Sequence, residues 1–254
     1  MKQILLTPAA GKRLIGMAIA VHPHLLSSLE NGIVAIVAGT TNGYVAEEIL
    51  RLTGNLEGFS RDAFFRGITM PPSRPVDDTG RLAGHNFPGD VIIVKGDWQK
   101  GKTLSDVAGE MKSGDLILKG ANSVNINTGT AAVLVGHPQG GTIIEAMKAV
   151  AGRRTRLIIP VGLEKRVSCS LEEISRKINS PGASGLRMIS FQGEIVTELE
   201  AISLLSGATA SLFAGGGVCG AEGSVWIAVE GGKEKEEKIK NIVNSIKNEP
   251  PFLL

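Results

Sequence analysis

Short apolar runs alternate with segments of helical spacing along most of this chain, and this alternation is the feature that most constrains its fold. Seven runs rich in β-branched residues end in glycine, asparagine or proline: 32–39, 90–96, 115–122, 155–162, 186–193, 208–217 and 224–232. Between most of them lie helical candidates at 44–52, 103–111, 142–151, 170–178 and 196–205. Near-continuous apolar strands are typical of a parallel sheet that is covered on both faces. The pattern therefore predicts a three-layer α/β/α fold with a mostly parallel, Rossmann-like sheet.

The chain is long and apolar enough to bury a sizeable core. It has 254 residues, of which 43% are hydrophobic and 20% are charged, and we expect a single α/β domain over residues 1–254. Residues 57–89 are rich in glycine, proline and charge and show no sustained period, so we expect an ordered, lid-like insertion at about 55–90. The tail predicts a last amphipathic helix whose apolar stripe is Ile239, Ile242, Val243 and Ile246.

Composition argues against several classes of partner. The formal charge is +2 and only 4% of residues are aromatic, so we do not expect nucleic acid as a partner. No apolar run reaches the roughly 18 residues of a membrane span, and we expect no membrane anchor. Cys169 and Cys219 lie in unrelated segments, which favours reduced cysteines in the cytoplasm.

Two histidines could suggest a metal site. His22 and His24 stand two residues apart, but no matching cysteine, aspartate or further histidine accompanies them. The alternative, which we favour, is that one helix ends here and another begins at Pro23. We therefore expect no metal and no cofactor.

The junction between the first internal strand and its helix could bind an anion. Parallel sheets bind ligands beyond the carboxyl ends of their strands, where a helix N-terminus offers free N–H groups. Gly39 and Gly43 allow close backbone approach, Thr40 and Thr41 supply hydroxyl groups, and Asn42 can cap the helix or tolerate a left-handed turn. A phosphate would fit this turn. The alternative is that Asn42 only caps the helix and Gly39 only makes the turn.

The sequence around this junction resembles that of a known superfamily. The stretch "LENGIVAIVAGTTNGYVAEEIL" is similar to the strand and helix of the ribose-5-phosphate isomerase, glucosamine-6-phosphate deaminase and CoA-transferase superfamily. "SGDLILKGANSVN" resembles a second strand and loop of the sugar-phosphate isomerases, and "NTGTAAVLVG" resembles a loop of the lactate-utilisation branch. The resemblance implies the three-layer fold, a small phosphorylated or CoA-linked substrate, and self-association into homo-oligomers.

The chain also departs from this superfamily. Asn122 stands where the isomerases carry an acidic residue of the active site, and an amide cannot act as a general base. The lysine-bearing segment of the isomerases is absent as well. In the CoA-transferase branch a glutamate near a late glycine-rich turn is the nucleophile, and the resemblance places Glu222 of "GAEGSVW" in that role.

Other polar residues could orient or transform a substrate. Lys95 and Lys119 each end an expected parallel strand, so their ammonium groups could converge on an anion, with Lys119 as a catalytic candidate. The loop after Lys119 carries polar side chains that suit a sugar or a carboxylate, although asparagine and threonine also build turns: Asn122, Asn125, Asn127, Thr128 and Thr130. His137 and Glu145 could form an acid and base pair.

Two hypotheses follow. The first is an enzyme that acts on a small anionic metabolite, with Lys119 and Glu222 as catalytic candidates. The second is a non-catalytic ligand-binding or sensory protein that keeps the anion pocket. A carboxylate that points into the same pocket as the threonines would distinguish them, and the candidates are Glu222, Glu145, Glu47 and Asp97.

Overall fold

A mixed six-stranded sheet forms the centre of the molecule. The computed structural model describes residues 1–74, 76–77, 82 and 87–252. The strand order in this sheet is β10 (Glu194–Val196), β8 (Arg156–Pro160), β5 (Leu116–Leu118), β2 (Ile33–Ile36), β3 (Val91–Val94) and β4 (Asp97–Trp98). The first four of these strands are parallel, whereas β3 and β4 run antiparallel to their neighbours. The expectation of a parallel strand at 90–96 is therefore wrong, because β3 returns beside β2 in the opposite direction.

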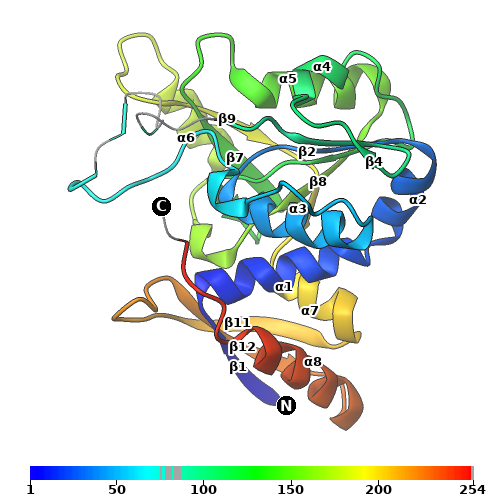
Figure 1. Cartoon of the computed structure of the whole chain (residues 1–254). Coiled ribbons are helices and arrows are strands. Elements are labelled where there is room, and N and C mark those ends of the chain that lie inside the picture. Colours follow the sequence, from blue (N-terminus) through cyan, green and yellow to red (C-terminus); the bar gives the residue numbers. More distant parts are fainter. Residues whose placement is uncertain (75, 78–81, 83–86, 253–254) are drawn as a thin grey trace.

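Helices cover both faces of this sheet (Figure 1). One face packs on α1 (Pro8–Ala20) and α3 (Thr40–Leu52), and the other packs on α4 (Leu104–Val107) and α5 (Gly141–Arg153). In β5, Leu116 and Leu118 belong to the first core cluster and Ile117 belongs to the second. A strand that is buried on both faces reads as a continuous apolar run, which is why the sequence predicts it well.

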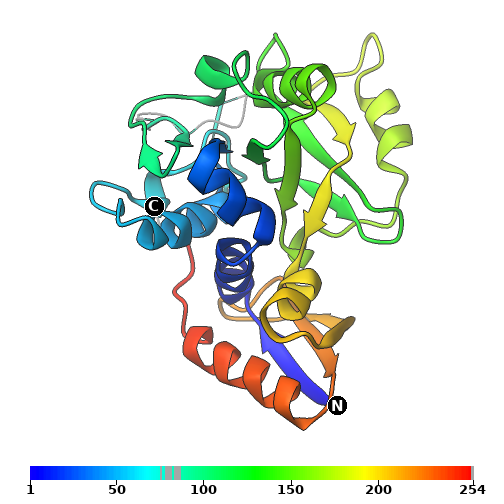
Figure 2. The same ribbon diagram turned by 90° about the vertical axis from the view of Figure 1, so that its right-hand side faces the viewer.

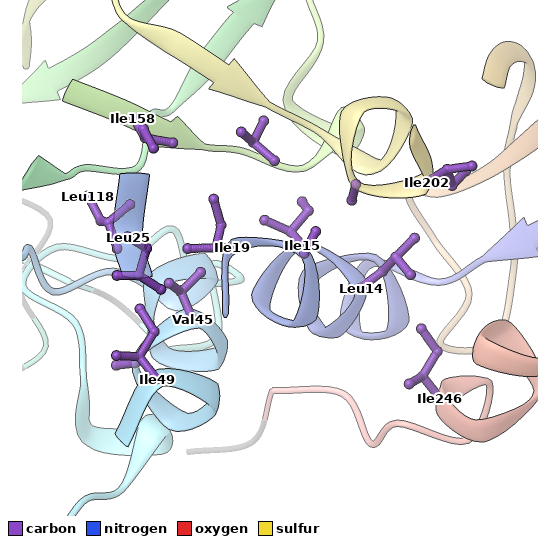
Figure 3. Packing of buried hydrophobic residues seen from close by; sticks show 14 of the residues in the cluster. Leu14, Ile15, Ile19, Leu25, Val45, Ile49, Leu118, Ile158, Ile202 and Ile246 are labelled. Carbon is purple, nitrogen blue, oxygen red and sulfur yellow. The ribbon is translucent and has the colours of Figure 1, made fainter. Parts of the chain in front are cut away.

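Helix α1 lies at the centre of the larger core. Figure 3 shows Ile19 of α1 between Val45 of α3 and Ile158 of β8, and Leu14, at the other end of the same helix, near Ile202 and Ile246. The chain then turns at Pro23 and continues as α2 (Pro23–Asn31), so the expected end and restart of a helix at Pro23 is confirmed.

Two small antiparallel sheets lie outside the central one. Strands β6 (Ser123–Asn125), β7 (Thr130–Val135) and β9 (Arg187–Phe191) form the first. Strands β1 (Lys2–Leu6), β12 (Ser224–Glu230) and β11 (Thr209–Gly216) form the second. The expectation that 186–193, 208–217 and 224–232 belong to a parallel sheet is wrong, since all three pair antiparallel in these small sheets.

The remaining helices pack beside the two small sheets. Helices α7 (Glu198–Ser206) and α8 (Lys233–Ile246) lie close to the β1–β12–β11 sheet, as Figure 2 shows, and α6 (Leu171–Ile178) packs against β9. The expected stripe of α8 is confirmed, because Ile239, Val243 and Ile246 are buried and Ile242 packs against the same core. No helix in the described part of the chain has the length and apolar character needed to cross a bilayer.

Candidate functional site

A cavity of about 1140 Å³ opens at the carboxyl ends of the parallel strands. Its walls include the residues that follow β2 and β5, the first turns of α3 and α5, and the described residues 66–71 of the expected insertion. The 3-10 turn η2 (Leu163–Lys165), which follows β8, closes another side. The cavity therefore lies at the edge of the sheet where parallel folds bind their ligands.

The expected loop at 39–43 is the first turn of a helix. Helix α3 begins at Thr40 rather than at Tyr44, and the extended Gly39 precedes it as an N-cap without a side-chain hydrogen bond. Helix α5 also begins at the cavity, after Gly140, and this N-cap likewise gives no side-chain hydrogen bond. Two helix N-termini thus offer N–H groups to one cavity, which favours a bound anion.

Asn42 of the α3 turn holds two strand ends, and both Asn42 and Thr41 keep unused hydrogen-bonding capacity. Nδ2 of Asn42 donates to the carbonyl of Val37 at 2.7 Å and to that of Leu118 at 2.9 Å, which fixes the ends of β2 and β5 side by side. Oδ1 of Asn42 and Oγ1 of Thr41 are buried and have no hydrogen-bond partner in the described part of the chain. Buried polar atoms are usually satisfied, so these two atoms indicate a place for a ligand.

The described lining carries more positive than negative charge. Its basic side chains are Lys12, Arg66, Arg74, Lys119 and Lys165, and its carboxylates are Glu145 and Glu164. Arg66 donates to Oδ2 of Asp90 at 2.7 Å, and Asp90 also accepts from the backbone N–H groups of Ala38 and Leu104. Asp90 therefore fixes both Arg66 and the backbone that leads into the α3 turn.

Lys119 lies at the end of β5, and its side chain is buried. It lines the cavity and makes no hydrogen bond or ion pair with any described residue. Burial lowers the pKa of this ammonium group to about 8, while Asp90 opposes the change and the charges of Arg66 and Lys165 add to it.

The sequence analysis missed Glu164 and Lys165, which form the cavity wall after β8. Both carboxylate oxygens of Glu164 are buried without a hydrogen-bond partner in the described chain, and Nζ of Lys12 lies 3.5 Å from Oε1. Lys165 donates to the carbonyl of Ala121 at 3.0 Å, and burial lowers the pKa of its ammonium group. One partial signal was present, because "LEK" directly follows the expected strand 155–162 at the same sheet edge as Lys119, but these letters do not show that the carboxylate is buried.

A second buried carboxyl group lies behind Glu164. Oε2 of Glu198, at the start of α7, accepts a hydrogen bond from the N–H of Leu163 at 2.8 Å. Burial raises the pKa of Glu198 to about 8, and the charge of Glu164 adds to this increase. Glu198 is therefore mostly protonated at neutral pH, and Glu164 is the carboxylate that faces the cavity.

The structure brings only part of the predicted polar loop to the cavity. Asn122 lines it and accepts from the N–H of Leu134 at 2.9 Å. The expected loop over 122–130 is wrong in form, because 123–125 and Thr130 are strand residues of the β6–β7 hairpin. Oδ1 of Asn125 accepts from the N–H groups of Asn127 and Thr128 in the turn, and the hydroxyl groups of Thr128 and Thr130 lie 2.8 Å apart. These side chains shape the hairpin and do not line the cavity.

Three further candidates lie outside the cavity. The N–H of Lys95 donates to the carbonyl of Gly32, which precedes β2, so Lys95 lies at the opposite edge of the sheet. The expected convergence of Lys95 and Lys119 is therefore wrong, because β3 is antiparallel. Gly43 packs against Arg61, and Glu222 is exposed in the β11–β12 connection, where it accepts from the N–H of Gly220.

The structure also shows where the other candidate carboxylates and the histidines lie relative to the cavity. Glu145 and His137 both line the cavity, but Glu145 pairs with Lys148 at 2.8 Å. Glu47 pairs with Arg13, and Asp97 lies in β4, so neither lines the cavity. Nε2 of His22 lies 2.9 Å from Oε1 of Glu194. Among the described residues, no group of three or more His, Cys, Asp and Glu side chains is placed to hold a metal ion.

Comparisons of the chain with protein-family models, with curated proteins and with solved structures gave no match. The superfamily resemblance stays a prediction.

Proposed function

We propose that this protein is an enzyme that acts on a small phosphorylated metabolite, sugar-phosphate-like or CoA-linked, in the cavity at the carboxyl ends of β2, β5 and β8. One observation carries the proposal. The N-termini of α3 and α5 meet several basic side chains around one cavity, and the wall holds the unpartnered hydroxyl group of Thr41, which can donate to an anion. Such a site stabilises an anion with several negatively charged oxygens.

A carboxylate in the same cavity favours an enzyme over a non-catalytic binding protein. Glu164 shares the cavity with Thr40 and Thr41, and its oxygens make no hydrogen bonds in the described chain. A desolvated carboxylate of this kind can take up a proton from a bound substrate. Glu164 thereby replaces the acidic group that the sequence lacks at Asn122.

The coarser features of the molecule support the remaining expectations. Helices on both faces of a largely parallel sheet support the three-layer, Rossmann-like description. Cys169 and Cys219 are both free, which supports a reducing cytoplasm. The exposed Phe213, Val218 and Trp226 near β11 and β12 support self-association.

A thermal-shift screen tests the anion site. Sugar phosphates, acyl-CoAs and inorganic phosphate are added to the wild type and to Thr41→Val, which removes the unpartnered hydroxyl group and keeps the side-chain shape. At about 100 times its dissociation constant, a ligand should stabilise the wild type by about 2.7 kcal/mol. We expect Thr41→Val to lose most of this shift while the ligand-free protein melts at an unchanged or higher temperature, because a buried, unsatisfied polar atom has gone.

Thr155→Val is the matched control. Oγ1 of Thr155 is also buried and unpartnered in the described chain, but Thr155 precedes β8 at the opposite edge of the sheet. This variant should keep the full ligand shift. Equal shifts in both variants, or no shift with any anion, would show that the α3 turn is not an anion site.

Glu164→Gln separates the enzyme from the binding protein. The ligand found in the screen is incubated with each protein and followed by ¹H and ³¹P NMR. We expect the wild type to change the spectrum of the ligand, and Glu164→Gln to keep the thermal shift but slow the change at least about a hundredfold, as the loss of a general base does. An unchanged spectrum with the wild type would favour the non-catalytic hypothesis.

A further inference from the structure

We propose that Nζ of Lys119 forms an imine with the carbonyl group of the substrate, so that the metabolite of this cavity is an aldehyde or a ketone. The inference deepens the proposed function and rests on it for the phosphate. Lys119 lines the cavity, the residue is 7% exposed, and its side chain has no hydrogen bond or ion pair with any described residue.

The surroundings of Lys119 disfavour its charged form. A buried ammonium group needs a counter-ion, and Asp90 is the carboxylate that acts on it. Arg66 and two backbone N–H groups already occupy the oxygens of Asp90, and the positive charges of Arg66 and Lys165 face Lys119 as well. The amine of Lys119 therefore has no partner among the described side chains and opens into the ligand cavity.

A neutral lysine is a nucleophile near physiological pH. The pKa of Lys119 is lowered from 10.5 to about 8 by burial, so near neutral pH the neutral fraction is more than about a hundredfold larger than for an exposed lysine. Amines in such surroundings react readily with carbonyl groups.

The step needs no oxidant or metal. The lone pair of Nζ attacks the carbonyl carbon, the new C–N bond forms, and the carbonyl oxygen takes up a proton to give a carbinolamine. Loss of the C–O bond then gives the C=N bond, and both amine protons leave with the oxygen as one molecule of water. We assign the transfer of protons between nitrogen and oxygen to Glu164, which lines the same cavity.

The anion site and Lys119 can serve one small molecule. Asn42, in the first turn of α3, bonds the carbonyl of Leu118, the residue before Lys119. The turn that would hold the phosphate and the amine that would bond the carbonyl carbon are thus fixed to each other through this contact. Phosphorylated aldehydes and ketones carry both groups.

Reductive trapping tests the inference. Wild-type protein at about pH 8 is mixed with one equivalent of pyridoxal 5′-phosphate, reduced with borohydride, and mapped by peptide mass spectrometry. We expect Lys119 to carry at least about tenfold more adduct than any other lysine, because its amine lines the anion site without a partner, whereas Lys165 already donates to the carbonyl of Ala121. Lys119→Met should lose this adduct, whereas Lys95→Met, at the opposite edge of the sheet, should keep it. Adduct on Lys165, or adduct spread evenly over the lysines, would overturn the inference.

Two further arms separate this inference from the proposed function. The melting temperature of Lys119→Met shows that it folds, and we expect no decrease, because a buried unpaired amine has been removed. Inorganic phosphate should slow the reaction of pyridoxal 5′-phosphate with Lys119, because both bind the anion site. It should slow the reaction of pyridoxal less, because pyridoxal lacks a phosphate group. A thermal shift with phosphate but no Lys119 adduct would overturn the imine alone. A Lys119 adduct that phosphate does not affect would support the imine and count against the phosphate site.

Discussion

At the scale of single residues, the buried carboxyl group of Glu198 should give the protein an unusual dependence of stability on pH. Its pKa is raised from 4.5 to about 8, first by burial and then by Glu164. The folded state therefore keeps a proton that the unfolded state releases, so the stability from this group is complete below about pH 4.5 and is lost as the pH rises through about 8.

Glu198→Gln should remove this dependence. The glutamine keeps an oxygen that can accept from the N–H of Leu163, but it does not titrate. Melting temperatures between about pH 5 and pH 8 should fall with pH in the wild type and should fall less in the variant. The control is Glu173→Gln, on the exposed face of α6, which should follow the wild type. An unchanged slope in Glu198→Gln would contradict the prediction.

For single residues, the structure also shows which members of the site could be predicted from the sequence. Thr40, Thr41, Asn42, Lys119 and Asn122 all lie at the cavity, because β2 and β5 are parallel neighbours and their carboxyl ends meet. The position predicted for Lys95 is wrong because the pattern of four apolar residues in β3 does not show whether the strand is parallel or antiparallel to its neighbour. Glu164 was missed because nothing in "VGLEKR" distinguishes a buried carboxylate from a surface one until the fold brings Lys12 and Glu198 beside it.

At the scale of elements, the contact between α1 and α3 depends on Gly16. A Cβ atom at this position would lie 2.9 Å from the backbone oxygen of Tyr44, so the helices would have to separate. Gly16→Ala should therefore destabilise the protein by about 1–3 kcal/mol despite the better helix propensity of alanine. Gly152→Ala is the matched control in α5, where a Cβ atom meets nothing within 4 Å, and it should stabilise by up to about 1 kcal/mol. Urea unfolding measures both, and equal effects would contradict the close contact.

The elements also show where sequence patterns fail. Most expected strands and helices exist. However, a strand that is buried on both faces and a strand that exposes apolar side chains on one face have the same apolar sequence pattern. Phe213 of β11 and Trp226 of β12 are 51% and 40% exposed. The sequence of these strands therefore predicts burial on both faces, although one face is exposed in the structure. These two strands pair antiparallel across the short connection 217–223, and β12 also pairs antiparallel with β1, which lies far away in the sequence.

At the scale of the whole molecule, an ion-pair network joins the segment after α8 to the central part. Glu249 pairs with Arg13 of α1 at 3.1 Å and with Arg61 of η1 (Arg61–Ala63) at 2.7 Å, and the ring of Tyr44 lies beside both guanidinium groups. Burial alone would raise the pKa of Glu249, but the two arginines outweigh it and lower that pKa. Three residues further on, Phe252 contacts Phe65 and lines the cavity.

Glu249→Gln should loosen this connection. We expect a loss of about 1–3 kcal/mol, because two guanidinium groups lose a partly buried partner. Hydrogen exchange should then become faster in residues 247–252 and in η1, whereas Glu237→Gln, which removes an exposed pair on α8, should change neither by a measurable amount. Unchanged exchange in Glu249→Gln would show that Phe252 alone holds the segment.

The pairing of β1 with β12 gives the folding of the chain a definite order. Lys2 lies opposite Val229, so β1 pairs with a strand that is synthesised much later. At about 5–20 residues per second, a ribosome takes on the order of ten seconds or more to produce the residues between them. During that time β1 waits without a partner, and its Leu6, which is fully buried in the finished protein, remains open to chaperones. The central sheet, whose strands lie between these two segments in the sequence, can form first, and the small sheet closes the molecule last.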